Sequence, residues 1–343
     1  MVIRICGRHA APPRPDNLPN SSRPTSCLAT YNRCMRILVT GTTGFIGGRI
    51  AAHLREAGHL VFGTHRLLSS GSAAAFPHLD GVGSVPLDLA KPQHICEVLK
   101  EARFDAVVHG AAMAGLGQCE LAPEAAVITN STATAAIASV CSEAGIRLIA
   151  LSTDQVFAGG PPVPGSTVPP GGYREEDATE PVNQYGITKQ MAEKTLLNMD
   201  APGITIVRLA LVIGRSLQGG RSSSEQLGAQ VVRGQVPTLY RNEFRTPVCV
   251  ADVCRAIEEL LPIQGVKLLH LGGPERMSRV ELGQRILRLA GLNDACNAAD
   301  VPKPAVGQAQ RPRDVSLDSL MVENLLKRPP RQIECFAGEF TCR

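Results

Sequence analysis

The chain of 343 residues is 44% hydrophobic and 19% charged, which is a composition typical of a globular protein with one large or two moderate domains. Tryptophan is absent, aromatic residues make up only 3%, and the net charge of +4 is scattered along the chain, so the sequence does not predict nucleic-acid binding. No uninterrupted apolar run is long enough to cross a bilayer, and we expect no membrane association.

The eleven cysteines lie far apart at irregular intervals and form no CxxC pair, and no two histidines have HExxH spacing. Neither a zinc site nor a disulfide framework is therefore predicted. The pattern is typical of reduced, mostly buried thiols, and we expect a cytoplasmic protein.

The first 34 residues are rich in Arg, Pro, Ser and Asn, and Asp16 is their only acidic residue. They contain no apolar core of a secretory signal, and the prolines disfavour the amphipathic helix of an organelle transit peptide. We expect residues 1–34 to be a disordered extension, such as a start codon assigned too far upstream would produce. A folded domain is predicted to begin at Met35.

From Met35 onward short apolar runs alternate with helical patterns, which indicates an α/β fold with a parallel sheet covered by helices on both faces. In the first half the predicted strands are 36–40, 59–65, 83–89, 105–112 and 146–153, and the predicted helices are 45–58, 91–104 and 122–145. In the second half the predicted elements are helix 185–198, strand 204–214, helix 223–234, strand 270–273 and helix 278–291.

We interpret residues 35–215 as a Rossmann-type, doubly wound NAD(P)-binding domain. Residues 216–343 are expected to form a smaller α/β substrate-binding region, part of which returns to the Rossmann sheet. Residues 158–176 are rich in Pro and Gly and predict a long loop, a kind of segment that often covers or binds a ligand.

Gly41, Gly44 and Gly47 form a G-x-x-G-x-x-G pattern between the first predicted strand and the first predicted helix. Glycines at these positions permit a tight turn and a close approach of the backbone to a pyrophosphate, which the helix N-terminus then stabilises. The alternative is a glycine-rich turn without a ligand, but the strand–loop–helix context favours dinucleotide binding.

The end of the second strand bears on the choice of cofactor. NAD-selective folds tend to place an acidic residue there for the ribose 2′-hydroxyl, whereas this chain has His65 and Arg66 and no acid until Asp80. Because an arginine suits a 2′-phosphate, NADP(H) is favoured over NAD(H), which stays possible. Alternatively, Arg66 is a solvated surface residue.

Two further strand ends are candidates on position alone. Asp88 and Leu89 end the third strand, where the adenine would lie, and Ala111 and Ala112 end the fourth, where small residues leave room for the cofactor. Both pairs could instead be ordinary packing at a strand end.

Three groups are predicted to converge at the carboxyl edge of the sheet, where ligands of such folds bind. Thr153 and Asp154 end the fifth strand, after Ser152, and Tyr185 and Lys189 lie one turn apart on the next helix. An adjacent ammonium would favour the phenolate and lower the tyrosine pKa from about 10. A hydroxyl nearby can hold a substrate carbonyl, so the set predicts a carbonyl reductase, although each group alone could be an exposed helix pair or a turn cap.

The chain resembles an extended short-chain dehydrogenase/reductase, and specifically the dTDP-4-dehydrorhamnose reductase family. The matching motifs cover most of the chain from Met35 onward: "TGTTGFIG" (40–47), "LSTDQVFAG" (151–159), "PVNQYGITK" (181–189), "RTPVCVADV" (245–253) and "RPRDVSLD" (311–318). Two features depart from the family: "RLALVIGR" (208–215) lacks the usual aromatic residues, and the 158–174 loop is longer and richer in proline.

The resemblance implies reduction of the 4-keto group of a nucleotide-linked 6-deoxy sugar, as in dTDP-rhamnose biosynthesis. Thr153, Tyr185 and Lys189 would be the catalytic triad, with Thr153 and Asp154 contacting the substrate and Lys189 the nicotinamide ribose. The implied partners are a sugar-nucleotide substrate and a second copy in a homodimer, with no metal. The expected cofactor-binding residues are Gly41, Gly44, Phe45, Ile46, Gly47, His65, Arg66, Asp88, Leu89, Ala111, Ala112, Tyr185 and Lys189.

Other functions stay open on the same resemblance. An epimerase or dehydratase could use this fold, although a dehydratase would want an acid and a base near Thr153, where Gln155 follows Asp154. The beta subunit of methionine adenosyltransferase resembles the same group and acts as a non-catalytic regulatory subunit. The complete Thr–Tyr–Lys set favours catalysis.

Overall fold

The computed structural model describes residues 34–65, 79–159 and 172–340. The expected N-terminal extension up to residue 33, Arg66 and most of the proline-rich loop lie outside these ranges. Nothing in the described part tests the expected domain boundary at residue 215, which stays a prediction.

A seven-stranded parallel sheet forms the centre of the fold, with the strand order β11-β6-β5-β4-β1-β2-β3. Its strands are β1 (Arg36–Thr40), β2 (Leu60–His65), β3 (Gly83–Pro86), β4 (Ala106–His109), β5 (Arg147–Thr153), β6 (Ile204–Leu209) and β11 (Leu268–Leu271). The chain order reverses between β1 and β4, which is the switch point where doubly wound folds bind ligands. The predicted Rossmann-type α/β class is confirmed.

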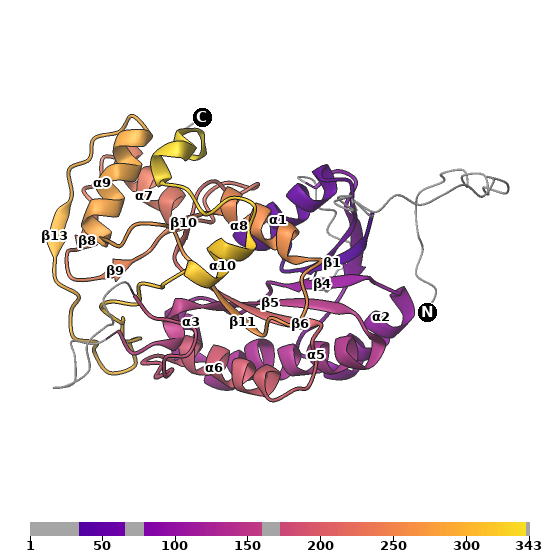
Figure 1. Ribbon diagram of the computed structural model, residues 1–343. Helices are drawn as coiled ribbons and strands as arrows, with labels where there is room; N and C mark the ends of the chain where they lie inside the picture. Colours follow the sequence, from indigo (N-terminus) through magenta and orange to yellow (C-terminus); the bar gives the residue numbers. More distant parts are fainter. Residues whose placement is uncertain (1–33, 66–78, 160–171, 341–343) are drawn as a thin grey trace, which may run out of the picture. The chain divides into compact units, whose positions relative to one another are not determined.

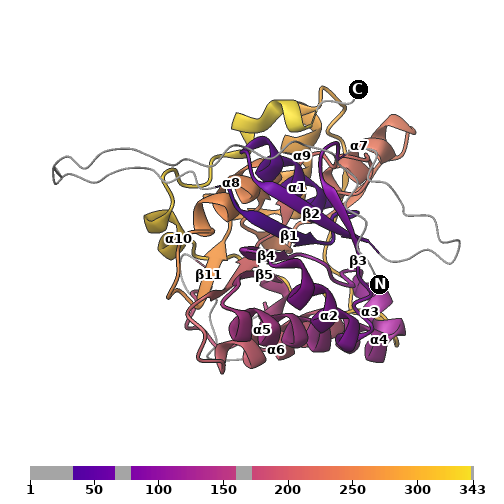
Figure 2. The same ribbon diagram turned by 90° about the vertical axis from the view of Figure 1, so that its right-hand side faces the viewer.

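Helices cover both faces of the sheet (Figure 1). One face carries α2 (Pro92–Ala102), α5 (Ala133–Ala144) and α6 (Gln184–Leu197), and the other carries α1 (Phe45–Glu56) and α8 (Val250–Leu260). The two layers lie on either side of the strands in the view along the sheet (Figure 2). The inner strands are consequently buried on both faces, as β5 shows with all seven residues buried.

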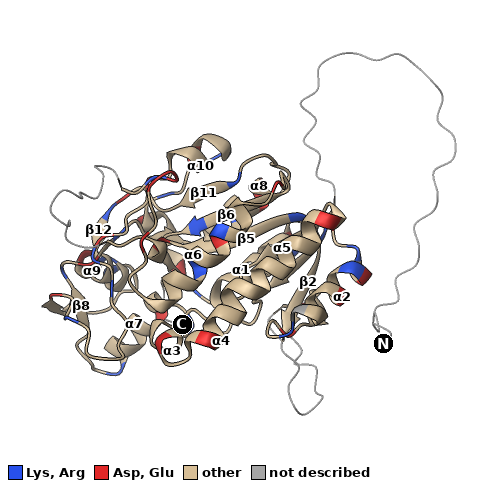
Figure 3. Ribbon diagram, turned by 90° about the horizontal axis from the view of Figure 1, so that it is seen from below, with Lys and Arg blue, Asp and Glu red and all other residues tan. Residues whose placement is uncertain are grey.

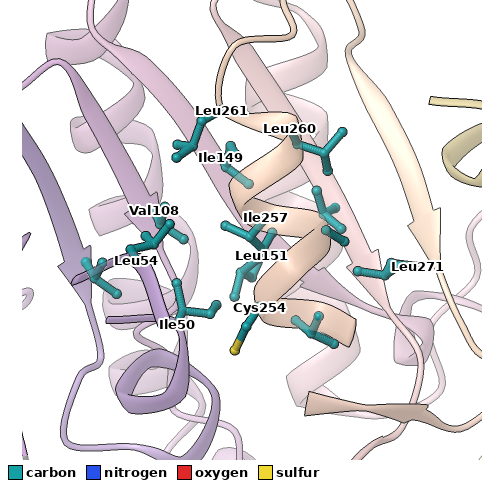
Figure 4. Close-up of a cluster of buried hydrophobic side chains, with 14 of the residues drawn as sticks. Ile50, Leu54, Val108, Ile149, Leu151, Cys254, Ile257, Leu260, Leu261 and Leu271 are labelled. Atoms are coloured by element: carbon teal, nitrogen blue, oxygen red, sulfur yellow. The ribbon is translucent and has the colours of Figure 1, made fainter. Parts of the chain in front are cut away.

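The core under α1 and α8 is built from branched aliphatic side chains. Figure 4 shows Leu54 of α1 and Ile257 of α8 packed over Val108 of β4 and Ile149 of β5. All four side chains have no exposed surface. This contact joins the glycine-loop helix to a helix that lies about 200 residues later in the chain.

The predicted helix 122–145 is three segments in continuous succession: α4 (Pro123–Val127), a π-helical turn η1 (Ile128–Thr132) and α5. The stretch Pro123–Ala144 is long and apolar enough to cross a membrane, but half of its most apolar window is buried in the protein. Its residues Ile137, Val140 and Cys141 pack in the core beneath the sheet. It is therefore a core helix.

The second half of the chain adds a group of short elements, most of which pack around their own apolar cluster, whereas the helix that contains Val322 packs into the core under α1 and α8. They are α7 (Ser223–Val232), β7 (Val212–Ile213), β8 (Thr238–Tyr240), β9 (Phe244–Arg245), β10 (Val248–Cys249), β12 (Met277–Ser278), α9 (Arg279–Leu289), β13 (Asn297–Ala299), α10 (Leu320–Leu325) and the 3-10 segment η3 (Ile333–Glu339). The predicted capping box of α9 is present: Ser278 Oγ accepts from Glu281 N, and Glu281 Oε2 accepts from Ser278 N. Basic residues are spread over many elements of the ribbon (Figure 3).

Several elements differ from the sequence prediction. Strand 105–112 ends at His109, so Ala111 and Ala112 lie beyond it, and strand 270–273 is Leu268–Leu271. Strand 204–214 is two strands, because β6 pairs within the large sheet up to Leu209 whereas β7 pairs with β10. Strand 83–89 ends at Pro86, so Asp88 and Leu89 lie beyond it in a turn, where Asp88 Oδ1 accepts from Ala90 N. A short helix, α3 (Leu116–Leu121), follows β4 and was not predicted.

The substitution Leu54→Ala should lower the free energy of unfolding by about 2–5 kcal/mol, because it opens a cavity in a core that has no exposed surface at this position. Leu60→Ala is the matched control, since Leu60 is 44% exposed and its truncation should cost less than about 1 kcal/mol. Urea unfolding followed by circular dichroism measures both, and equal losses in the two variants would contradict the packing described.

Candidate active site

The glycine loop makes a tight turn that only glycines can form. Gly41 has a φ of +78°, and a Cβ on Gly47 would lie 2.4 Å from the Gly41 carbonyl oxygen. Helix α1 then begins after Gly44 with no side-chain cap and no acidic residue in its first turn. Its first N–H groups are thus without a side-chain acceptor, and this arrangement fits the pyrophosphate of a dinucleotide.

A buried polar cluster holds the loop against the end of β4. Thr40 Oγ1 accepts from the backbone N–H groups of Gly110 and Ala111 at 3.1 and 3.0 Å, and it lies 2.8 Å from His109 Nδ1. Burial lowers the pKa of His109 to about 3, so the imidazole is neutral. Ala111 is in consequence packed so closely that a Cβ on Gly41 would lie 2.9 Å from it.

Only some of the other predicted cofactor residues line a cleft at the sheet edge. Phe45 and Ile46 begin α1 and line a cleft at the carboxyl edge of the sheet. His65 is buried at the end of β2, and Ala111 and Ala112 follow β4 by two and three residues. Arg66 lies outside the described residues.

The end of β5 presents Thr153 and Asp154 to the same cleft. The chain turns there into the 3-10 segment η2 (Asp154–Val156), which is capped by a bond from Gln155 N to Thr153 Oγ1 at 3.2 Å. Thr153 Oγ1 in turn donates to Asp154 Oδ1 at 3.2 Å. The turn fixes the threonine hydroxyl beside the carboxylate.

Tyr185 stands at the first turn of α6, whose N-terminus is capped by Asn183 through a bond from Gly186 N to Asn183 Oδ1. Burial raises the pKa of Tyr185, the carboxylate of Asp154 raises it further, and a hydrogen bond with Thr153 opposes both effects. The expectation that Lys189 lowers this pKa is therefore wrong for the structure as it stands: the phenol is held protonated.

Lys189 is buried one turn further along α6, and its Nζ donates to the carbonyl of Leu151 at 2.7 Å. Burial lowers the pKa of Lys189 to about 8, against the raising effect of Glu193. Because an ammonium has three N–H groups, the bond to Leu151 leaves others for a second acceptor.

A buried ion pair lies behind Lys189. Arg208 Nη2 of β6 lies 2.8 Å from Glu193 Oε2, with both side chains 3% exposed, and Ser152 Oγ donates to the other oxygen of Glu193. Arg208 also contacts the buried His270 of β11 at 3.1 Å. These bonds tie α6 to β5, β6 and β11.

Asn130 is a structural member of the site that sequence reasoning missed. It lies fully buried in the π-helical turn, and its side chain bonds both the N–H and the carbonyl of Met113 and the hydroxyl of Thr188 on α6. It thereby joins the segment after β4 to α6. The available signal was the polar run 129–132 within a predicted apolar helix, since Asn, Ser and Thr favour caps and turns.

The cleft holds about 610 Å³ and is bounded on its far side by charged residues from the second half of the chain. These are Glu243, Arg245, Arg279 and Arg311, together with the aromatic ring of Tyr240. Arg245 and Arg311 fall in motifs that carry the family resemblance, but spacing gave neither of them a role. Arg279 and Glu243 had no signal in the sequence.

Comparison with known proteins shows the family of the chain. The model of the RmlD substrate binding domain matches residues 35–338. The chain belongs to this family. Its dTDP-4-dehydrorhamnose reductase from Salmonella typhimurium is 31% identical over 247 residues, 70% of this chain and 73% of the relative. The predicted resemblance is confirmed.

Two other relatives have names that indicate different roles, one a reductase and one a subunit of another enzyme. A probable low-salt glycan biosynthesis reductase of Haloferax volcanii is 28% identical over 85% of this chain and 92% of its own length. The methionine adenosyltransferase 2 subunit beta of Pongo abelii is also 28% identical, over 84% of this chain and 82% of its own.

Solved structures agree with the fold. A hypothetical dTDP-4-dehydrorhamnose reductase of Sulfolobus tokodaii has a TM-score of 0.72 at 25% identity and covers 88% of this chain and 99% of its own. The enzyme of that name from Bacillus anthracis, in complex with NADP, has a TM-score of 0.71 at 19% identity over 91% of this chain and 99% of its own. The reductase relatives confirm the predicted class, an NAD(P)-dependent oxidoreductase.

The substitution Gly47→Ala should weaken NADPH binding at least tenfold, because the added Cβ would collide with the Gly41 carbonyl and distort the turn. Gly203→Ala is the matched control, since its Cβ would lie 3.8 Å from the only neighbouring atom, the Ile146 carbonyl oxygen. Fluorescence titration with NADPH measures both. Wild-type affinity in Gly47→Ala would contradict a loop that cradles the cofactor.

Between pH 8 and about 10.5 the free energy of unfolding of the wild-type protein should rise more than that of Lys189→Met, and the difference between the two proteins should grow by an amount on the order of 1 kcal/mol. In this window the unfolded chain binds a proton at Lys189 that the native protein has released, so raising the pH favours the native state. Lys194→Met is the control: Lys194 is exposed on the same helix and should keep the wild-type slope. Urea unfolding at pH 8 and 9.5 decides, and identical slopes in all three proteins would refute the lowered pKa.

Proposed function

We propose that the protein catalyses the NADP(H)-dependent reduction of the 4-keto group of a nucleotide-linked 6-deoxy sugar. The observation that carries the proposal is the convergence of Thr153 and Tyr185 with the start of α1 on one cleft, with Lys189 buried behind them. The helix that follows the cofactor loop and the proton donor thus face the same space, as carbonyl reduction requires. The reductase relatives support the same reaction.

Tyr185 is the proton donor in this proposal. Its raised pKa keeps the phenol protonated until a carbonyl oxygen accepts the proton. Thr153 lies in hydrogen-bond contact with Tyr185 and can donate to the same oxygen, which holds the carbonyl in place and stabilises the charge that develops there. Bound NADPH would supply the hydride that reaches the carbonyl carbon, and the product is a secondary alcohol.

Lys189 positions the cofactor in the proposal. With a pKa of about 8 it is mostly protonated at neutral pH, and it offers N–H groups beyond the one bonded to Leu151. A ribose hydroxyl of the nicotinamide is a suitable acceptor, so the lysine would position the cofactor.

NADP(H) is the proposed cofactor. The sequence has no acid after β2 until Asp80, and therefore no carboxylate to bind a ribose 2′-hydroxyl or repel a 2′-phosphate there. The substrate is proposed as a sugar nucleotide because the cleft combines the arginines of its far wall with the carboxylates of Asp154 and Glu243. Arginines suit phosphate groups, and carboxylates suit sugar hydroxyls.

The test follows NADPH absorbance with dTDP-linked 4-keto-6-deoxyhexose as substrate. Tyr185→Phe should lower kcat by about 10²–10⁴-fold, because general acid catalysis contributes rates of that order, and should keep NADPH affinity within about threefold. Tyr173→Phe is the matched control: its hydroxyl accepts from Gly159 N, outside the cleft lining, and its loss should leave kcat within about threefold. The kcat/KM with NADPH should exceed that with NADH.

The reductase proposal fails if the wild-type protein binds NADPH but oxidises none of a panel of keto-sugar nucleotides. The similarity to the methionine adenosyltransferase subunit makes a regulatory role the named alternative. A methionine adenosyltransferase whose activity changes when the protein is added would support that alternative.

A further inference from the structure

Two buried carboxylates face the cleft from different segments of the chain. Asp154 lies in η2 after β5, and Glu243 immediately precedes β9. Each residue is 4% exposed, and each lines the cleft. Nearly 90 residues separate them in sequence, so the fold brings them to one place.

The guanidinium of Arg245 lies between these carboxylates and compensates their charge. Its Nε is 3.5 Å from Asp154 Oδ2 and its Nη2 is 3.2 Å from Glu243 Oε1. Its hydrogen bonds, however, go to backbone carbonyls: Nη1 donates to Phe244 at 2.7 Å, and both terminal nitrogens donate to Pro312. Arg245 therefore compensates part of the charge of the pair without supplying the hydrogen bonds that the carboxylate oxygens need.

One oxygen of each carboxylate is left without a hydrogen-bond partner. Asp154 Oδ2 and Glu243 Oε2 are the only buried side-chain polar atoms in this condition within 34–65, 79–159 and 172–340. A buried acceptor without a donor is costly, typically about 1–3 kcal/mol and more when charged. Such exceptions in a folded protein call for an explanation, and a ligand that donates hydrogen bonds in the cleft provides one.

The charges around the two carboxylates indicate which kind of hydrogen-bond donor the ligand carries. Arg279 Nε lies 3.9 Å from Glu243 Oε1, and Arg311 Nη1 lies 3.8 Å from Glu243 Oε2. Three guanidinium groups thus accompany two carboxylates, so an ammonium group would meet an excess of positive charge. An anionic group would in turn be repelled by the unpartnered oxygens. An uncharged hydroxyl donor fits both constraints.

The resemblance already implies that Asp154 contacts the substrate; we propose that Glu243 is a second substrate-binding carboxylate, and that the two each accept a hydrogen bond from a hydroxyl group of the substrate and so make the cleft selective for a hydroxylated sugar. The inference rests on the proposed reductase function. Because Thr153 would hold the ketone oxygen, its neighbour Asp154 accepts from the hydroxyl on the adjacent carbon, C3 of the sugar. Glu243 lies on the other side of Arg245 and accepts from the next hydroxyl, on C2.

The experiment compares kcat/KM for three substrates on each protein preparation: dTDP-linked 4-keto-6-deoxyhexose and its 3-deoxy and 2-deoxy analogues. The wild-type protein should prefer the parent at least tenfold over each analogue, because an analogue leaves a buried acceptor unpaired. Asp154→Asn should reduce the discrimination against the 3-deoxy analogue severalfold, and Glu243→Gln that against the 2-deoxy analogue. A ratio of two substrates on one preparation is independent of the fraction of folded protein.

Asp300→Asn is the matched control, because Asp300 pairs with Arg241 at the surface, where both side chains are 62% exposed, and it should keep the wild-type ratios. If the parent is reduced but the analogues are reduced equally well, the hydroxyl proposal is overturned while the reductase function stands. Wild-type ratios in either carboxamide variant overturn the proposal for that residue. If neither the parent nor the analogues are reduced, the reductase function itself has failed.

Discussion

The buried ion pair between Glu193 and Arg208 is the interaction on which the geometry of the site depends. A charge pair with 3% exposure is tolerated only because Ser152 and His270 complete its hydrogen bonds. Since Glu193 and Lys189 share α6, a helix fixed by this pair cannot rotate or slide without breaking it. The lysine is thereby held against the Leu151 carbonyl, and the tyrosine against Thr153. Removing either ion partner would leave a buried charge, which costs several kcal/mol, so position and stability are linked here.

The two sides of the cleft differ in how they achieve recognition. The cofactor side uses backbone: a glycine turn, uncapped N–H groups of α1, and the backbone of Gly110 and Ala111 held close by Thr40. The far side uses side chains, three arginines and the carboxylate of Glu243, drawn from β9, α9 and the segments beside them. Backbone recognition tolerates sequence change at most positions and suits a cofactor shared by a whole superfamily. Side-chain recognition changes with single substitutions and suits a substrate that distinguishes one relative from another.

The sequence predicted the elements whose information is local. Strand 36–40, the glycine loop and the Tyr185–Lys189 spacing each lie within a dozen residues, and hydrophobic period and turn chemistry determine them. Pairing between distant segments could not be predicted from the sequence. The division of 204–214 between two sheets depends on β10 and β11, which lie about 40–60 residues later. The same holds for Glu243 and Arg279, whose proximity to Asp154 exists only in the folded chain. The Tyr185 pKa was mispredicted because spacing on a helix carries no information about burial or about Asp154.

The absence of aromatic residues in 208–215 fits the chemistry of the cleft. Among its lining residues the aromatic rings are those of Phe45, Tyr185 and Tyr240, and only Tyr240 belongs to the charged side. Stacking on a base or a sugar can thus contribute little to recognition there. Charge-assisted hydrogen bonds are directional and about twice as strong as neutral ones, so arginines and carboxylates can supply both affinity and orientation in place of stacking. Under the proposed function, a substrate bound in this way would be held by its hydroxyl and phosphate groups, and its ketone would be aligned with Tyr185 by contacts on the neighbouring carbons.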